Sequence, residues 1–466
     1  KIFLVASECV PFIKTGGLAD VVGALPAALK KLGAEVSVLI PKYSMIPQQF
    51  RKEMQHVTDF SIQLGWRKQY VGVEKIHREG IDFYFADNEF YFKQDYVYSS
   101  GDFEAERYCW FSKAALEIMQ KLDIVPDIIH LNDWQTGMIP LLLREQYSTL
   151  PEFSRVKTVF TIHNLRYQGL MNPMLVNDLL SLGQNALAQI EYYCNINCMK
   201  AGIIYSDAVT TVSPTYAKEI CTPRCGETLD GLLRHKHIAG ILNGIDKKLY
   251  NPWTDKALCS RFSKNQPQGK QKCKSALQTA LGLEQSEERP VAAVISRLTN
   301  QKGLDLFRAV IPGLLDLGAQ LVILGMGDAE YERMFADLAA INPSSVAFRA
   351  EMNDALARQI YAGADIFLMP SAFEPCGLSQ LLAMRYGAIP VVRETGGLAD
   401  TVIPYNRFTD DYSADELYNA SRAAIELYCG DKAAWQRLTA RAMAADFGWS
   451  RSAGEYLHLY KTLKMN

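Results

Sequence analysis

Two cations near residue 300 have the type and spacing of an anion site. Arg297 and Lys302 are five positions apart at the junction between a predicted strand and a predicted helix, and Gly303 leaves the backbone room. Two positive side chains that meet on one anion fit a diphosphate leaving group, because they neutralise the charge that develops as its bond to a sugar breaks. An exposed basic turn is the alternative interpretation.

A carboxylate suited to sugar chemistry follows another predicted strand. Glu374 lies in the run Phe-Glu-Pro-Cys-Gly-Leu at 373–378, where Pro375 fixes the backbone and Gly377 leads into a helix. Glu374 could accept hydrogen bonds from sugar hydroxyls or shield positive charge on a sugar carbon, and the helix N–H groups could bind hydroxyls or phosphate. Cys376 has no base close in sequence, so we interpret it as a backbone-positioning residue.

The hexapeptide Thr-Gly-Gly-Leu-Ala-Asp occurs twice, at residues 15–20 and 395–400. Each copy lies between a β-like run and a helical pattern, where paired glycines let the backbone approach a ligand and the first helical N–H groups point at it. A phosphate group is the ligand that such a loop is best suited to bind. One copy alone would favour a tight strand-to-helix turn. Two copies in separate halves of the chain predict two similar domains that face each other across a cleft.

Other polar or glycine residues also follow predicted strands. They are Lys14, Gly16, Gly17, Asn132, Asp133, His163, Asn164, Gly325 and Gly327. Ligands of parallel sheets bind beyond the carboxyl ends of the strands, so this shared position favours a functional role. Each residue also has a structural alternative: His163 could be a hydrogen-bonded core residue, and Asn132-Asp133 an Asx turn.

The elements that position these residues follow a βαβ rhythm. The predicted strands cover residues 2–6, 36–40, 128–131 and 156–162, then 291–295, 320–324, 345–348, 366–369 and 389–392, and helices fill the gaps. We therefore predict an α/β fold with two doubly wound, Rossmann-like domains. Alternating, aromatic-rich strands at about 55–92 predict a smaller β insertion. Apolar residues at helical spacing in 450–463 predict a terminal helix packed on a neighbouring domain.

Composition excludes several classes of protein. The chain has 466 residues, which is too long for a single hydrophobic core. Its net charge of -2 gives no positive surface field that would attract nucleic acid. It has no long apolar span or signal peptide, so we expect a cytoplasmic protein with no membrane partner. Ten scattered cysteines form no disulfide framework. The pairs Cys194/Cys198 and Cys221/Cys225 could suggest zinc, but helical spacing explains the first pair and no second ligand pair lies nearby, so no metal is expected.

Taken together, these motifs resemble the family of bacterial glycogen synthases and plant starch synthases. The matching stretches are 14–21, 130–137, 161–169, 241–246, 296–298 with 301–303, 373–378 and 395–400. They occur in family order and cover nearly the whole chain.

The resemblance implies a GT-B fold and a hexosyltransferase activity. The implied enzyme moves glucose from ADP-glucose to the non-reducing end of an α-1,4-glucan such as glycogen or a malto-oligosaccharide, with retention and without a metal ion or other cofactor. The implied domains are an N-terminal, acceptor-side domain at 1–245, a nucleotide-sugar-binding domain at 246–449, and a C-terminal helix at 450–466 that packs back on the first domain.

The resemblance also implies roles for individual residues. The implied catalytic residues are Asp133, His163, Arg297, Lys302 and Glu374. The implied donor-binding residues are Lys14, Gly17, Asn243, Met352, Cys376, Gly377, Leu378, Ser379, Thr395 and Gly396, and Asp20 is implied on the acceptor side. In this set Arg297 and Lys302 hold the diphosphate, while Asp133, His163, Asn243 and Glu374 surround the glucose.

Three departures from the family pattern stand out. Ala372 replaces a frequent Arg, so one charge near the site is lost. Met352 falls where the family often has an aromatic residue against the adenine. A Gly-rich stretch that usually follows Asn406 is missing before Arg407: it is deleted here, or the numbering closes over a loop that was left out.

Two further function classes stay open at this point. One is a glucan-binding or regulatory homologue without turnover, although a binder has no need for leaving-group cations. The other is a related glycosyltransferase that uses UDP-glucose or makes sucrose-like products. The sequence discriminates poorly between ADP and UDP.

Overall fold

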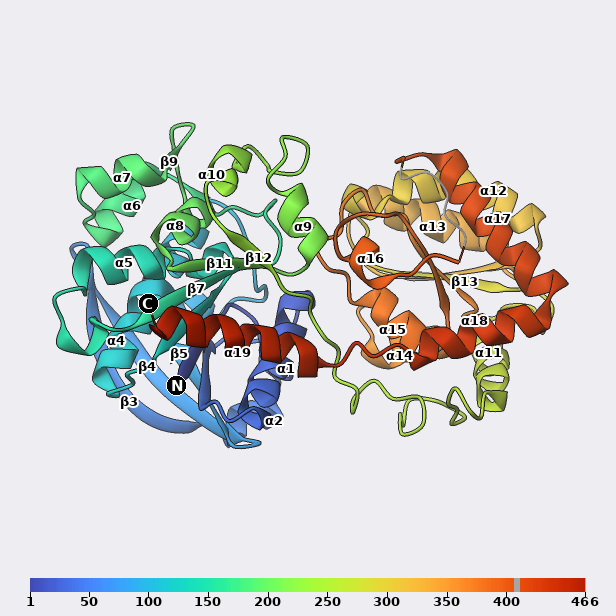
Figure 1. Ribbon diagram of the computed structural model, residues 1–466, viewed down its shortest axis with the longest axis horizontal. Helices are drawn as coiled ribbons and strands as arrows, with labels where there is room; N and C mark the ends of the chain where they lie inside the picture. Colours follow the sequence, from blue (N-terminus) through green and yellow to red (C-terminus); the bar gives the residue numbers. More distant parts are fainter. Residues whose placement is uncertain (406–410, 466) are drawn as a thin grey trace. The chain divides into compact units, whose positions relative to one another are not determined.

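The structure is a computed structural model that describes residues 1–405 and 411–465. The chain divides into two compact units, Lys1–Gly244 with Trp449–Asn466, and Ile245–Gly448. The predicted boundaries after residues 245 and 449 lie one residue beyond these. In Figure 1 the first unit contains the blue to green part of the chain and the terminal helix α19 (Trp449–Met465).

A nine-stranded sheet organises the first unit, in the order β12-β11-β7-β6-β1-β2-β5-β4-β3. The strands are β1 (Ile2–Val5), β2 (Val36–Pro41), β3 (Gln55–Leu64), β4 (Arg67–Arg78), β5 (Ile81–Asp87), β6 (Ile128–Asn132), β7 (Lys157–Ile162), β11 (Ala208–Thr211) and β12 (Ile238–Gly240). All neighbours from β12 to β5 pair in parallel. The central strands are buried on both faces, as their apolar runs predict.

The segment predicted as a small β insertion is part of this main sheet. β5 pairs in parallel with β2, and β4 pairs antiparallel with both β5 and β3. The alternating side chains correctly predicted β-strands in this segment. Alternation shows which face of a strand is buried, but it does not show which other strand it pairs with. The hairpin of β3 and β4 therefore widens the sheet at its edge.

Helices and one small sheet complete the first unit. The helices are α1 (Gly17–Lys31), α2 (Gln48–Glu53), α3 (Glu89–Phe92), α4 (Asp102–Lys121), α5 (Met138–Gln146), α6 (Pro173–Leu180), α7 (Gln184–Ile190), α8 (Cys198–Tyr205), α9 (Pro214–Glu219) and α10 (Asp230–Arg234), with 3-10 turns η1 (Trp134–Thr136) and η2 (Pro151–Phe153). The small sheet contains β8 (Leu170–Met171), β9 (Glu191–Tyr192) and β10 (Asn195–Asn197).

The terminal helix α19 belongs to the core of the first unit. Its buried residues Trp449, Tyr456 and Tyr460 lie in the same apolar cluster as β1 and β6, and the helix packs against α1 (Figure 1). The Tyr460 hydroxyl forms a 2.7 Å hydrogen bond with Nδ1 of His130 on β6. This buried contact ties the end of the chain to the strand that carries the Asn132-Asp133 motif.

The second unit is a doubly wound parallel sheet in the order β15-β14-β13-β16-β17. The strands are β13 (Val291–Ile295), β14 (Gln320–Leu324), β15 (Val346–Arg349), β16 (Ile366–Met369) and β17 (Ile389–Val392). The helices are α11 (Gln268–Leu281), α12 (Leu304–Asp316), α13 (Ala329–Ile341), α14 (Asp354–Gly363), α15 (Ser379–Arg385), α16 (Gly396–Thr401), α17 (Ala414–Gly430) and α18 (Lys432–Ala444), with the turn η3 (Asn300–Lys302).

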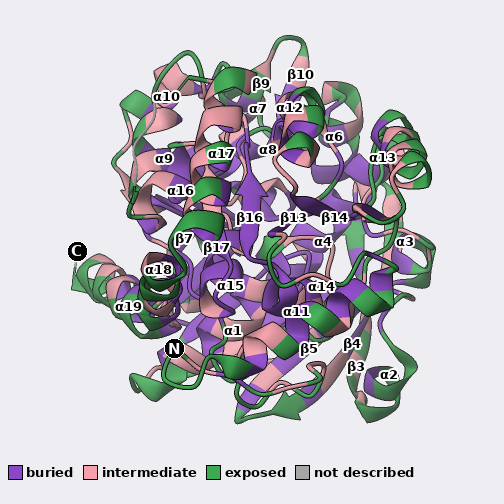
Figure 2. Ribbon diagram, turned by 90° about the vertical axis from the view of Figure 1, so that its right-hand side faces the viewer, coloured by how far each residue is buried: buried purple, intermediate pink, exposed green. Residues whose placement is uncertain are grey.

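Side chains of β13 alternate between two cores in the second unit. Val291 and Ala293 pack with residues of α11 and α14, whereas Ala292 and Val294 pack with residues of α12, α13 and α17. Figure 2 shows β13, β14 and β16 as buried strands. Helices on both faces of a parallel sheet confirm the predicted α/β class. Among the residues that the structure describes, no helix is long and apolar enough to cross a membrane.

Candidate active site

The loops after the strands of the second unit interlock at one edge of the sheet. Gly303, with φ of 69°, lies so close to the loop after β16 that an added Cβ would be 2.0 Å from the carbonyl oxygen of Pro370. In the same contact, the N–H of Ala372 donates to the carbonyl of Gln301 at 2.9 Å. The loop that carries Lys302 and the loop that carries Glu374 are therefore in direct contact. Only glycine fits this position.

Lys302 and Glu374 form an ion pair in this contact. Nζ of Lys302 lies 2.7 Å from Oε2 of Glu374, and the hydroxyl of Ser371 donates to the same oxygen at 3.0 Å. The two side chains are only 16% and 8% exposed. The sequence placed both residues at strand ends but did not predict that they touch. A largely desolvated cation and carboxylate are thus held together at the end of the sheet.

The second hexapeptide packs against the loop after Glu374. The N–H of Gly397 donates to the carbonyl of Glu374 at 3.0 Å, and a Cβ on Gly397 would be 2.1 Å from the carbonyl oxygen of Cys376. Gly377 has φ of 70°, and the buried amide of Gln380 donates to the carbonyls of Cys376 and Gly377. In this copy, the second glycine allows close packing of two loops, and the buried Cys376 lies in the interior of the contact.

The other predicted donor residues of the second unit lie at the same edge. Arg297 is exposed in the loop after β13, and Met352 is 69% exposed in the loop after β15. Leu378 is the N-cap of α15 and Ser379 its first residue, while Thr395 is the N-cap of α16 and Gly396 its first residue. The parallel sheet therefore gathers all of them beyond its carboxyl ends, as the βαβ pattern predicts.

The first hexapeptide begins helix α1 in the first unit. Gly16 is its N-cap, without a side-chain cap, and Gly17 is exposed at its first position. Nζ of Lys14 lies 3.0 Å from Oδ1 of Asp20, so the predicted donor cation and the predicted acceptor-side carboxylate form an ion pair. Glu8, a buried carboxylate that binds this loop, was not predicted from the sequence. A charged residue in the apolar segment after β1 was the available signal.

Asp133 is held in an unusual backbone conformation at the end of β6. Its φ of 58° and ψ of 178° are rare for a residue with a side chain, and such strain gathers at functional sites. Oδ1 accepts the N–H of His163 at 2.7 Å and that of Asn164 at 3.4 Å, which joins the ends of β6 and β7. Burial raises the pKa of Asp133 to about 7, although both N–H groups lower it.

His163 is neutral and its tautomer follows from its neighbours. Burial lowers the pKa of His163 to about 3. Its Nε2 lies 2.9 Å from Oδ1 of Asn132, whose amide nitrogen donates to the carbonyl of Val5. Because Oδ1 can only accept, Nε2 carries the proton and Nδ1 is left as an acceptor. Asn243 is also buried, and its Oδ1 has no hydrogen-bond partner among the described residues.

The pair Cys194 and Cys198 does not have the helical geometry that its spacing suggested. Cys194, with φ of 62°, is exposed in the turn between β9 and β10, whereas Cys198 is buried at the start of α8. The helical explanation of this pair was wrong, because a left-handed residue breaks the helix pattern before α8 begins. Across residues 1–405 and 411–465, no group of three or more His, Cys, Asp or Glu is placed to hold a metal ion.

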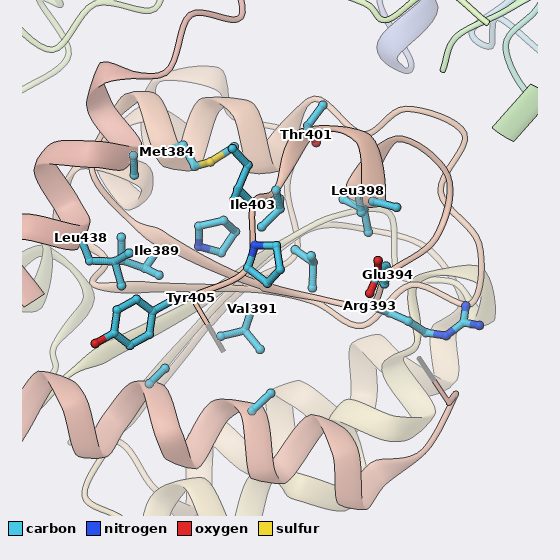
Figure 3. A pocket seen from close by; sticks show the side chains of 18 of the residues that line it. Met384, Ile389, Val391, Arg393, Glu394, Leu398, Thr401, Ile403, Tyr405 and Leu438 are labelled. Carbon is cyan, nitrogen blue, oxygen red and sulfur yellow. The ribbon is translucent and has the colours of Figure 1, made fainter. Parts of the chain in front are cut away.

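An apolar cavity of about 600 Å³ in the second unit is lined in part by Leu398 and Asp400 of the second hexapeptide. Figure 3 shows Met384, Ile389 and Leu438 in its wall, with Arg393 and Glu394 toward one end. Its described lining residues include none of the predicted catalytic residues. The position before Arg407, where the Gly-rich stretch usual in the family is missing, falls outside the described residues.

Comparisons with known proteins identify the family of this chain. Residues 1–235 match the family described as the starch synthase catalytic domain, and residues 282–439 match glycosyl transferases group 1. The chain is 47% identical to the glycogen synthase of Desulforamulus reducens over 100% of this chain and 99% of the relative. It is also 47% identical to that of Exiguobacterium sibiricum, over 99% of each chain.

The chain belongs to the glycogen and starch synthase family. Members of this family are glycosyltransferases, so the protein is a hexosyltransferase of glycogen or starch synthesis. The catalytic domain of starch synthase IV from Arabidopsis thaliana, bound to ADP and acarbose, has a TM-score of 0.93 at 33% identity, over 100% of this chain and 99% of that chain. This similarity identifies the fold as GT-B and confirms its two Rossmann-like domains. A sucrose-phosphate synthase from Thermosynechococcus elongatus, at TM-score 0.64 and 18% identity, shares the fold alone.

Proposed function

We propose that this family member transfers glucose from ADP-glucose to the non-reducing end of an α-1,4-glucan, with retention of the α anomer. The observation that carries the proposal is the Lys302–Glu374 pair at the carboxyl end of the second sheet. It places a desolvated cation beside a carboxylate, which suits the departure of an anion from a polyhydroxylated sugar.

In this proposal, Lys302 and Arg297 bind the diphosphate as it leaves. Lys302 is already oriented by Glu374, whose carboxylate is itself held by the Ser371 hydroxyl, so little reorganisation is needed when the negative charge develops. Glu374 accepts hydrogen bonds from sugar hydroxyls. The Cys376–Ser379 backbone binds donor oxygens at the start of α15, and the Thr395-Gly396 segment at the start of α16 contributes to the same donor site.

The first unit contributes acceptors and a further cation. Nδ1 of neutral His163 accepts a sugar hydroxyl, and Asn243 contributes its buried Oδ1. Asp133 lies beside His163, whose backbone N–H it accepts. Lys14 and Gly17 bind the diphosphate from this unit, and Asp20, the partner of Lys14, lies on the glucan side.

The nucleotide, the lack of a metal and the compartment are further parts of the proposal. The Arabidopsis neighbour is described as bound to ADP, which supports adenine as the base, and we place Met352 against it. Lys14, Arg297 and Lys302 supply the positive charge that a metal would otherwise bring, so transfer should persist in a chelator. All ten cysteines are free thiols, which favours a reducing compartment, the cytoplasm.

A donor panel tests this proposal. The purified protein is given ADP-glucose or UDP-glucose with a glycogen primer, and nucleotide release and chain extension are measured separately. We expect both signals with ADP-glucose. Binding of glucan without release of nucleotide would identify a silent homologue, and faster extension with UDP-glucose would identify the alternative donor.

A further inference from the structure

We propose that Glu8 is a positioning residue for donor binding, whose buried carboxylate fixes the loop that begins helix α1. The inference rests on the proposed function, in which this loop binds the donor diphosphate. Glu8 is 2% exposed and follows β1, the central strand of the first sheet. Its hydrogen bonds join the loop to the end of this strand.

Both oxygens of Glu8 hold the loop. Oε1 accepts the hydroxyl of Thr15 at 2.8 Å and the hydroxyl of Tyr98. Oε2 accepts the backbone N–H of Thr15 and that of Gly16 at 3.3 Å. All four donors are neutral groups, and all of them donate to the carboxylate of Glu8. Two of these hydrogen bonds orient the successive peptide groups of Thr15 and Gly16.

The orientation of these peptides decides where α1 can bind an anion. Gly16 has no side-chain cap, and the N–H groups of the first helical turn have no intrahelical acceptor. Glu8 uses the N–H groups of Thr15 and Gly16, which leaves those of Gly17 and Leu18 for a ligand beside Lys14. The N–H groups of Thr15 and Gly16 thus hold the loop in place, whereas those of Gly17 and Leu18 can bind the ligand.

Tyr98 gives Glu8 a rigid partner on a second loop. Its hydroxyl also lies 2.8 Å from Oγ of Ser7. The preceding residue, Val97, is fixed by the fully buried Arg107, whose Nη2 donates to the carbonyl of Val97 at 2.9 Å. The position of Glu8 is therefore determined from both sides, and the loop is preorganised before any ligand binds.

The charge of Glu8 distinguishes positioning from a direct electrostatic effect. A negative charge behind an anion site repels the anion, so neutralising it would strengthen binding if charge alone mattered. If position matters, Glu8→Gln weakens binding, because an amide offers one acceptor atom where the carboxylate offers two. The two explanations therefore predict opposite changes in the affinity for ADP when Glu8 is replaced by Gln.

The experiment measures the affinity for ADP by calorimetry and the Michaelis constants of the reaction. We expect Glu8→Gln to weaken ADP binding about tenfold and Tyr98→Phe about threefold, because a hydrogen bond lost behind the loop weakens ligand binding by less than its full strength. The donor KM should rise in parallel, while kcat and the glucan KM stay within about twofold. The matched controls are Tyr147→Phe, which removes a 2.6 Å tyrosine–carboxylate hydrogen bond elsewhere in the same unit, and Glu117→Gln, which removes the charge of its acceptor. Both should bind ADP normally.

Unchanged or tighter ADP binding by a folded Glu8→Gln protein would overturn the inference. If that variant does not fold, Tyr98→Phe and Thr15→Val, which remove single hydroxyls, decide the matter in the same assay. The variant Lys14→Ala distinguishes a failure of the role of Glu8 from a failure of the proposed donor site. If it weakens ADP binding while the Glu8 variants do not, only the role of Glu8 fails. If the wild-type protein does not bind ADP, the proposed function fails with it.

Discussion

Replacing Lys302 with alanine should abolish most turnover while leaving the fold intact. The substitution removes an ammonium group that lies 2.7 Å from Glu374 and is mostly shielded from water. In the proposed reaction this cation meets the leaving diphosphate. Because the charge on that group grows only as the glycosidic bond breaks, the loss falls mainly on kcat and less on substrate binding.

The expected magnitude follows from the burial of the pair. One preorganised donor to a developing charge in a desolvated site is worth about 3 kcal/mol, or about a hundredfold in rate. The variant also leaves Glu374, 8% exposed, with Ser371 as its remaining side-chain donor. That should lower the free energy of unfolding by about 1–3 kcal/mol.

The assay combines steady-state rates with ADP-glucose and glycogen and thermal unfolding of each variant. The double variant Lys302→Met/Glu374→Gln removes both charges and should recover most of the stability while remaining inactive. Arg308→Ala is the matched control, because Arg308 lies on the following helix and forms a 3.6 Å ion pair with Glu330 that is largely exposed. It should change neither stability nor rate beyond experimental error. Near-normal turnover in a folded Lys302→Ala protein would refute the reasoning.

Three other variants give independent checks. Met352→Tyr should lower the KM for ADP-glucose several-fold at unchanged kcat, since stacking on the base is worth roughly 0.5–1.5 kcal/mol in ground and transition states alike; an unchanged KM would mean that Met352 does not touch the base. The raised pKa of Asp133 means that the folded protein holds this proton more tightly than the unfolded chain, so wild-type stability falls as pH rises through about 7. Asp133→Asn should therefore gain about 1–2 kcal/mol relative to wild type between about pH 5 and about pH 8.5 in unfolding experiments, and a constant difference would exclude the shift. Gly397→Ala places a Cβ 2.1 Å from the Cys376 carbonyl and should lower both melting temperature and kcat, whereas Gly430→Ala, with open space around it, should be silent; equal behaviour of the two would contradict the packing role.

Much of the second unit could be predicted from the sequence because its strands are short apolar runs bounded by polar residues. The predicted ranges 291–295, 320–324, 366–369 and 389–392 coincide with β13, β14, β16 and β17. In the first unit, β11 and β12 were missed, since Ala-Val-Thr-Thr and Ile-Ala-Gly carry too little apolar character to mark a strand. Their place in the sheet depends on pairing with β7, which is a tertiary property.

In the site, too, the sequence predicts the position of residues along the chain but not their contacts. Spacing placed Lys302 and Glu374 at strand ends, but the contact between them depends on the close approach at Gly303 and Pro370. The tautomer of His163 depends on the orientation of the Asn132 amide, which a sequence does not contain. Glu8 went unnoticed because a single carboxylate after a strand has no periodic signal, and its partner Tyr98 lies 90 residues away.

The most direct test of the proposed reaction is the structure of its product. Maltoheptaose is incubated with the protein and ADP-glucose labelled in the glucose, and the product is analysed by mass spectrometry and by NMR of the new linkage. The account predicts maltooctaose and longer chains, with the label at the non-reducing end in an α-1,4 bond, and one ADP released for each glucose added. Release of ADP without chain extension, or a labelled glucose in a β linkage, would contradict it.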